Sequence, residues 1–141
     1  MSNWYEDVKD FHKAFEQRVG EYPAIPEDVN ERELRINLLE EEFNEYLQAE
    51  EDADLVEIAD ALADLIYIAC GTAVSYGIPL DKVFEEVHRS NMAKLIDGKV
   101  LRRVDGKVQK PEGWTPPDIK SILIRKERCT EEQIRNALIT L

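Results

Sequence analysis

Two groups of carboxylates in this chain are spaced so that each would form an acidic row on a helix. They lie at 41–45 and 57–64, and their members are Glu41, Glu42, Glu45, Glu57, Asp60 and Asp64. On a helix that turns about 100° per residue, each group occupies one face. Two facing rows of carboxylates repel each other unless cations lie between them, and such oxygen ligands suit Mg²⁺ or Mn²⁺. The spacing therefore predicts a divalent-metal site between two helices.

The second group is the stronger evidence for a metal site because its surroundings are apolar. Asp60 and Asp64 are the only charged residues in the run 58–69, and a charge buried among apolar side chains needs a partner. The alternative is a polar stripe that faces water on an otherwise buried helix. For the first group the alternative is an ordinary solvated surface, since 30 of the 141 residues are Asp or Glu.

These segments resemble the paired acidic helices of a known enzyme superfamily. Residues 39–47, followed by 57–67, are similar to the all-α nucleoside triphosphate pyrophosphatases, which include MazG-like enzymes, dimeric dUTPases, dCTP pyrophosphatases and phosphoribosyl-ATP pyrophosphohydrolases. The similarity continues through 76–80 and 86–95. The segment 105–119 resembles the phosphoribosyl-ATP pyrophosphohydrolase-like branch.

The resemblance implies an all-α fold, a four-helix bundle with a small C-terminal extension. It also implies Mg²⁺-dependent hydrolysis of an NTP or dNTP to the monophosphate and pyrophosphate, for house-cleaning of the nucleotide pool. A homodimer or homotetramer is predicted from the pattern of the third helix, which is more apolar than three partners in one chain can easily cover. Such a reaction needs an activated water, neutralised phosphate oxygens and a good leaving group. The expected metal ligands are Glu42, Glu45, Asp60 and Asp64.

Other roles in this reaction follow from position. Glu41 or Glu57, whichever stays outside the metal's ligands, could accept the proton of the attacking water. Asn91 and Lys94 share a face at the far end of a predicted helix and match the family's basic, Asn-containing segment, so we expect them to contact phosphate. Weaker candidates for the same role are Lys82, Arg89 and Lys99.

One departure from the superfamily leaves the second pair of ligands open. Its second motif is Glu-x-x-Asp, which Glu57 and Asp60 satisfy literally. The distance to Gly77, however, places Asp64 where the family's Asp usually stands, and Ala61 then replaces the Glu.

Composition limits the class of protein. With 141 residues and 43% hydrophobic content, the chain is long enough for a single domain over 1–141. A net charge of -12 argues against a nucleic-acid partner, because such binding relies on Lys and Arg. Neither a secretion signal nor a membrane segment is indicated. The chain has two cysteines, Cys70 and Cys129, and so few favour free thiols over a disulfide framework. Together these features fit a cytoplasmic protein best.

Apolar periodicity and capping residues predict four helices over about 3–96. The first, second and fourth helices span about 3–19, 31–50 and 80–96. The third begins after Asp52 or Asp54, reaches about Tyr76 and stops at Gly77.

The C-terminal extension, 97–141, has a different character. Asp105-Gly106 between valines predicts a hairpin turn, Thr115 to Asp118 the start of a short helix, and Thr130 to Gln133 a capping box for a last helix. Trp114, in a Pro-Gly loop, is the aromatic residue that best suits stacking on a base.

Two other functions are compatible with the sequence. Glu85 and His88 have the Glu-x-x-His spacing of di-iron bundle proteins, so a carboxylate di-iron oxidoreductase or metal store is one alternative. The other is a non-catalytic helical interaction module that retains the acids as a degenerate site.

Overall fold

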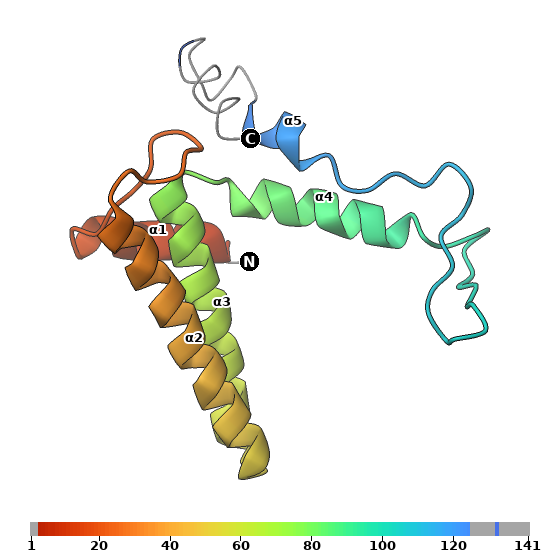
Figure 1. The fold of residues 1–141 in the computed structure, drawn as a ribbon, viewed down its shortest axis with the longest axis horizontal. Coiled ribbons are helices and arrows are strands. Elements are labelled where there is room, and N and C mark those ends of the chain that lie inside the picture. The colour runs from red at the N-terminus through yellow and green to blue at the C-terminus, as the bar shows by residue number, and fades with distance from the viewer. Residues whose placement is uncertain (1–2, 125–131, 133–141) are drawn as a thin grey trace.

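The computed structural model describes residues 3–124 and 132 of the chain. The described part is helical, as predicted, and holds no β-strand. Its helices are α1 (Trp4–Ala14), α2 (Val29–Glu51), α3 (Leu55–Tyr76), α4 (Leu80–Met92) and α5 (Ile119–Leu123). Figure 1 shows α2 and α3 as a long antiparallel hairpin, with α1 across its open end. The prediction of a single domain over 1–141 stays a prediction.

Short polar side chains begin the first three helices. Asn3, Asp28 and Asp54 each accept a hydrogen bond from a backbone amide in the first turn of α1, α2 and α3. Asp54 is thus the cap of the third helix, one of the two residues predicted for it. Gly77 ends α3 in the left-handed conformation, at φ 68°, which confirms the predicted stop.

Two helices are shorter than predicted. α1 ends at Ala14 instead of near residue 19, because Glu16 adopts a left-handed φ of 55° and turns the chain. α4 ends at Met92 instead of near residue 96. There Asp97 has a φ of 50°, and a tight turn pairs Ile96 with Lys99.

The loop between α1 and α2 closes the C-terminal end of α3. The last four carbonyls of a helix have no partner within it, and in α3 all four accept a hydrogen bond. From Ala73 to Tyr76, in order, the donors are Ile78 N, Gly20 N, Arg18 Nε and Ala24 N, at 2.8, 2.8, 3.0 and 2.9 Å. Gly20 lies against the backbone of Gly77, where a Cβ atom would not fit. The loop and the helix end therefore form one hydrogen-bonded unit.

The buried core of the described part is small and lies between α1 and α3. Val8, Cys70 and Val74 are its fully buried members. Cys70 is a free thiol, as predicted, and burial raises its pKa. Cys129 lies outside the described residues. By length and composition alone α3 could cross a membrane, but core helices of soluble proteins share these properties, and α3 packs against α1 and α2.

A buried arginine joins α2 to α3. Arg35, only 5% exposed, donates from Nε to Thr72 Oγ1 at 3.1 Å and from Nη2 to the Ile68 carbonyl at 2.9 Å. Its guanidinium occupies the space that a side chain at Gly71 would fill, beside His12. Burial lowers the pKa of Arg35. The contact fixes how far the two helices are shifted along each other.

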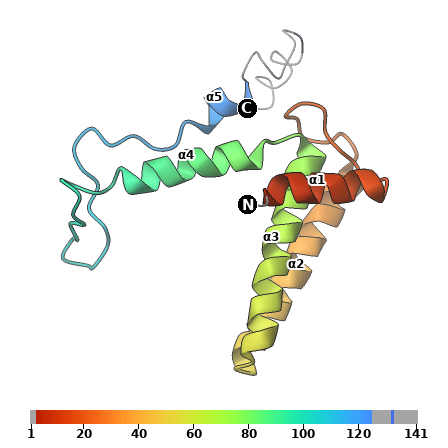
Figure 2. The same ribbon diagram turned by 180° about the vertical axis from the view of Figure 1, so that it is seen from behind.

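α4 leaves this group of helices. Figures 1 and 2 show from opposite sides that it runs away from the α2–α3 hairpin, and that the following chain returns along it to α5. An antiparallel bridge between Arg102 and Val108 confirms the hairpin predicted around Asp105-Gly106. α5 is the predicted short helix, capped by Asp118 instead of Thr115. The capping box predicted at Thr130 lies outside the described residues.

We expect Gly71→Ala to destabilise the protein by about 1 to 3 kcal/mol, because the new methyl group would displace the hydrogen-bonded Arg35. The same change in an ordinary helix stabilises by about 1 kcal/mol. A double-mutant cycle with Arg35→Ala, followed by urea unfolding, measures the coupling. Gly71→Ala should be neutral or stabilising once Arg35 is truncated. An equal loss in both backgrounds would show that the contact does not set the packing.

Candidate functional site

The structure brings three of the predicted ligands together between α2 and α3. One carboxylate oxygen from each of Glu42, Glu45 and Asp64 lies within 4.8 Å of the other two. Glu42 and Glu45 lie one turn apart on α2, and Asp64 comes from α3, so the group joins the two helices. Glu42 and Asp64 are half-buried, whereas Glu45 is exposed. One ion could contact all three carboxylates from the solvent side.

We call Glu42, Glu45 and Asp64 the acidic cluster. Its electrostatics favour a bound cation. Burial, and then the charges of Glu45 and Asp64, raise the pKa of Glu42. Burial, and then Asp60 and Glu45, raise the pKa of Asp64. Glu42 Oε2 is buried and has no hydrogen-bond partner among the described residues. A cation would both neutralise the repulsion and satisfy this oxygen, so the residues fit a divalent metal.

The other predicted acids lie at the margin of the cluster or beyond it. Asp60 is one turn from Asp64 on α3 and raises its pKa, but it is exposed. Glu41 lies beside Glu42 and also raises that residue's pKa. Glu57 is exposed near the start of α3, roughly 10 Å along the helix from Asp64 at the usual rise per residue. The structure thus groups three of the six acids, places Glu41 and Asp60 next to members of that group, and leaves Glu57 apart.

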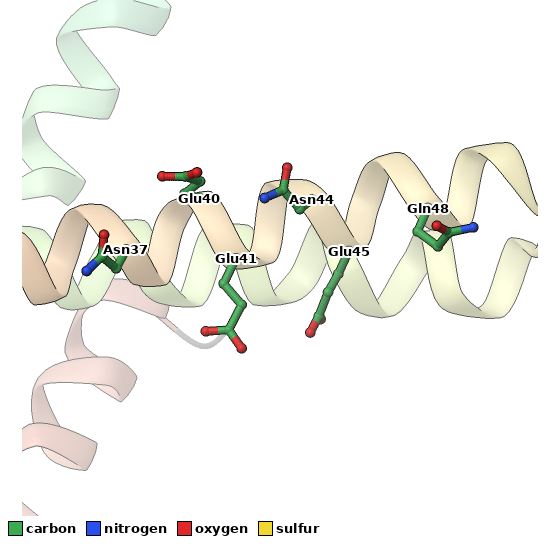
Figure 3. A pocket seen from close by; sticks show the side chains of 6 residues that line it. All are labelled: Asn37, Glu40, Glu41, Asn44, Glu45 and Gln48. Atoms are coloured by element: carbon green, nitrogen blue, oxygen red, sulfur yellow. The ribbon is translucent and has the colours of Figure 1, made fainter.

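A shallow groove adjoins the acidic cluster on the outer face of α2. Its volume is about 520 Å³ and it is open to solvent. Figure 3 shows that Glu41 and Glu45 leave α2 on the same side within this groove. The lining residues are Asn37, Glu40, Glu41, Asn44, Glu45 and Gln48. Glu41 is therefore near the cluster and in contact with water.

Asn91 and Lys94 lie together, as predicted, but not beside the acids of the same chain. Lys94 Nζ donates to Asn91 Oδ1 at 3.1 Å. Asn91 lies in the last turn of α4 and Lys94 follows its end, and Figures 1 and 2 show that this end of α4 points away from the α2–α3 hairpin. Of the weaker candidates, Lys82 and Arg89 are engaged by Glu85 and Glu86, at 3.5 and 2.7 Å. Lys99 is exposed.

Two residues near Lys94 take positions that the sequence did not predict. Trp114 uses its indole Nε1 to donate to the Ser90 carbonyl at 2.8 Å, so its ring is attached to α4. Lys110, which the sequence analysis did not single out, places Nζ 4.6 Å from the centre of that ring. The four-residue spacing between Lys110 and Trp114 is the one feature of the sequence that relates the two residues. It falls in a loop, where spacing does not predict which side chains are in contact.

The residues of the di-iron alternative do not form a metal site in one chain. Glu85 and His88 are both exposed on α4, and Glu85 pairs with Lys82. Among the described residues, the group of acids and histidines close enough to hold one metal ion consists of the acidic cluster alone.

Comparison with known proteins agrees with a divalent-metal site between α2 and α3. A family model described as phosphoribosyl-ATP pyrophosphohydrolase matches residues 8–91, from within α1 almost to the end of α4. The chain belongs to the phosphoribosyl-ATP pyrophosphohydrolase family. This family lies within the all-α nucleoside triphosphate pyrophosphatase superfamily, so the resemblance inferred from the sequence is confirmed. Phosphoribosyl-ATP pyrophosphohydrolases act on nucleotides, depend on divalent metals and are typically oligomeric.

The family match contains all the predicted acids and Asn91, and it ends before Lys94 and the extension. One viral relative is the uncharacterized protein L479 of Acanthamoeba polyphaga mimivirus. It is 31% identical over 80 residues, which cover 55% of this chain and 32% of the viral protein. The chain thus corresponds to about a third of that relative, whose name assigns no activity.

Asp64→Asn should raise the melting temperature of the metal-free protein by about 2 to 4 °C, because it removes one of three mutually repelling carboxylates. Added Mg²⁺ should stabilise the wild type and have little effect on the variant. Differential scanning calorimetry with and without Mg²⁺ measures both effects. Asp10→Asn, on exposed α1 surface, is the matched control and should respond to Mg²⁺ like the wild type. Wild-type-like stabilisation of the Asp64 variant by Mg²⁺ would exclude Asp64 from the site.

Proposed function

We propose that the chain is a Mg²⁺-dependent nucleoside triphosphate pyrophosphohydrolase that converts an NTP or dNTP to the monophosphate and pyrophosphate. The observation that carries the proposal is the acidic cluster, three carboxylates from two helices within 4.8 Å, in a member of a pyrophosphohydrolase family. A role in clearing the nucleotide pool, in the cytoplasm, accords with this activity.

Glu42, Glu45 and Asp64 would hold the metal, with Asp60 at the edge of the site. All four supply carboxylate oxygens, the donors that Mg²⁺ and Mn²⁺ prefer. When bound, the metal supplies positive charge against the phosphate oxygens and lowers the pKa of a nearby water. The protein's part is to hold the carboxylates at a fixed separation across α2 and α3.

Glu41 is the better placed of the two candidates for accepting the proton from the attacking water. It lies on the solvent side of α2 with Glu45, in the open groove. Glu57 is about two helical turns from Asp64. A carboxylate that does not bind the metal keeps a lone pair free to accept a proton. We therefore assign this role to Glu41.

A homodimer or homotetramer is part of the proposal. Large apolar side chains are exposed along both the hairpin and α4, among them Leu62 and Ile66 on α3 and Phe84 on α4, the last at 69% exposure. Large contiguous apolar patches are rare on monomeric proteins, so exposed apolar side chains on two elements favour a covering partner. A second copy of the chain would cover such faces symmetrically.

Hydrolysis in ¹⁸O-water should place the label in the nucleoside monophosphate and release unlabelled pyrophosphate, since a water activated beside the acidic cluster attacks the α-phosphorus. Mass spectrometry of the products measures this. Glu45→Ala should lose activity by at least about 100-fold while keeping its helix content. Glu33→Gln, on the exposed surface of α2, is the control and should retain activity.

Several results would contradict this assignment. Label in the pyrophosphate would move the attack to the β-phosphorus. Release of single orthophosphate would refute a pyrophosphohydrolase. A purified protein that binds Mg²⁺ but hydrolyses no nucleotide in a panel of ribo- and deoxynucleotides would favour the non-catalytic interaction module.

Phe84→Glu should shift the protein toward monomers and lower its melting temperature, because a charge would replace an apolar side chain in the subunit contact. Light scattering at micromolar concentration measures the assembly. Glu85→Gln, at the neighbouring exposed position, is the control and should leave the assembly unchanged. A wild-type monomer that is folded and active at this concentration would contradict the oligomer.

A further inference from the structure

The chain separates its charges along its length. Residues 94–110 contain six Lys or Arg and two Asp, although the whole chain carries a net charge of -12. This basic segment begins at the end of α4, at the opposite end of that helix from the α2–α3 hairpin in Figures 1 and 2. A third of the 18 Lys and Arg residues of the chain are therefore gathered in this segment.

Within the basic segment, two ammonium groups share one aromatic ring. Lys94 Nζ lies 5.4 Å and Lys110 Nζ 4.6 Å from the centre of the Trp114 ring. Both distances are within the range in which an indole attracts a cation. Without the ring the two like charges would separate. Trp114 therefore holds them near each other.

Neither of these lysines is neutralised in the described part of the chain. The ion pairs there use other cations, Lys82, Arg89 and Arg103, each with a nearby carboxylate. Lys94 donates instead to Asn91 Oδ1, which leaves the Asn91 amide nitrogen as a further donor. The result is two unpaired ammonium groups and an amide, all donors, beside one ring.

The ring itself is rigidly attached to α4. The Trp114 indole donates to the carbonyl of Ser90, a residue only 1% exposed, whose hydroxyl donates to the Thr115 carbonyl at 3.4 Å. One helical turn away, the Asp118 amide donates to Glu86, and Arg89 and this amide lower the pKa of Glu86. The segment that carries Lys110 and Trp114 is thus held against α4, two residues after which Lys94 follows.

We propose that Lys110, positioned by the Trp114 ring, joins Asn91 and Lys94 in a phosphate clamp that binds the phosphate chain of the nucleotide held at the acidic cluster of a second copy of this chain. A polyphosphate is the ligand that fits several unpaired donors at one site. The second copy is required because α4 carries the clamp away from the acidic cluster of its own chain. The inference rests on the proposed function and its homodimer, and it adds Lys110 and Trp114 to the site.

The first test is steady-state kinetics of single variants. Lys110→Ala should raise KM for the triphosphate by about 10- to 100-fold, the effect of one charge-assisted contact, and Lys110→Arg should recover most of it. Lys107→Ala, in the preceding hairpin turn and not one of the two cations over the Trp114 ring, is the matched control and should change KM by less than about 3-fold. Equal KM values for the wild type and Lys110→Ala would refute the clamp.

A second set of variants tests Trp114 as a positioning residue. Trp114→Phe retains a ring for the two cations and should raise KM less than Trp114→Leu does, with kcat changed little in both. In the Lys110→Ala background, replacing Trp114 by Leu should add much less to KM than it does in the wild type. Equal effects in both backgrounds would mean that Trp114 acts only on folding.

A complementation experiment tests the second copy. An Asp64→Ala chain and a Lys94→Ala/Lys110→Ala chain, co-expressed with different tags and purified as the mixed dimer, share one intact site of two. The mixed dimer should show about half of the wild-type activity, although each variant alone is nearly inactive. No recovery would refute sharing between copies. A wild type that hydrolyses no nucleotide would instead refute the proposed function, so the two failures are distinguishable.

Discussion

The contact between Arg35 and Gly71 determines how α2 and α3 are aligned, and the acidic cluster depends on that alignment. Glu42 follows Arg35 by seven residues, and Asp64 precedes Gly71 by seven. Seven residues are about two turns, so in an antiparallel pair the two contacts lie at matching levels. A shift of one turn would separate the carboxylates by about 5 Å along the axis. The buried guanidinium of Arg35, which packs where Gly71 has no side chain, thus fixes the separation between the carboxylates.

Features set by neighbouring residues could be predicted from the sequence, and those set between helices could not. The carboxylate rows, the cap at Asp54 and the stop at Gly77 follow from local spacing and backbone preference. Whether Asp60 or Asp64 faces Glu42 depends on the alignment of two helices, which no local pattern contains. The direction of α4 and the position of Lys110 over Trp114 depend on contacts across more than one element.

The acidic cluster opposes the stability of the fold that carries it. Raised pKa values at Glu42 and Asp64 mean that ionising these groups is unfavourable in the folded chain without a cation. The small apolar core, around Val8 and Val74, and the hydrogen bonds of Arg35 lie toward the opposite end of the hairpin from its turn. Residues that stabilise the fold and residues that bind the metal therefore occupy different levels of the same two helices.

The hydrogen bonds that close the C-terminal end of α3 have a consequence for local motion. With all four terminal carbonyls bonded, this end of the hairpin should exchange its amide protons slowly. The other end is an exposed turn at residues 52–54, with Ala53 in the left-handed region, so we expect local opening to start there. The acidic cluster lies between the two. A metal bound by Glu45 and Asp64 would link α2 to α3 in the half of the hairpin nearer the turn. Slower amide exchange near the turn would therefore report metal binding.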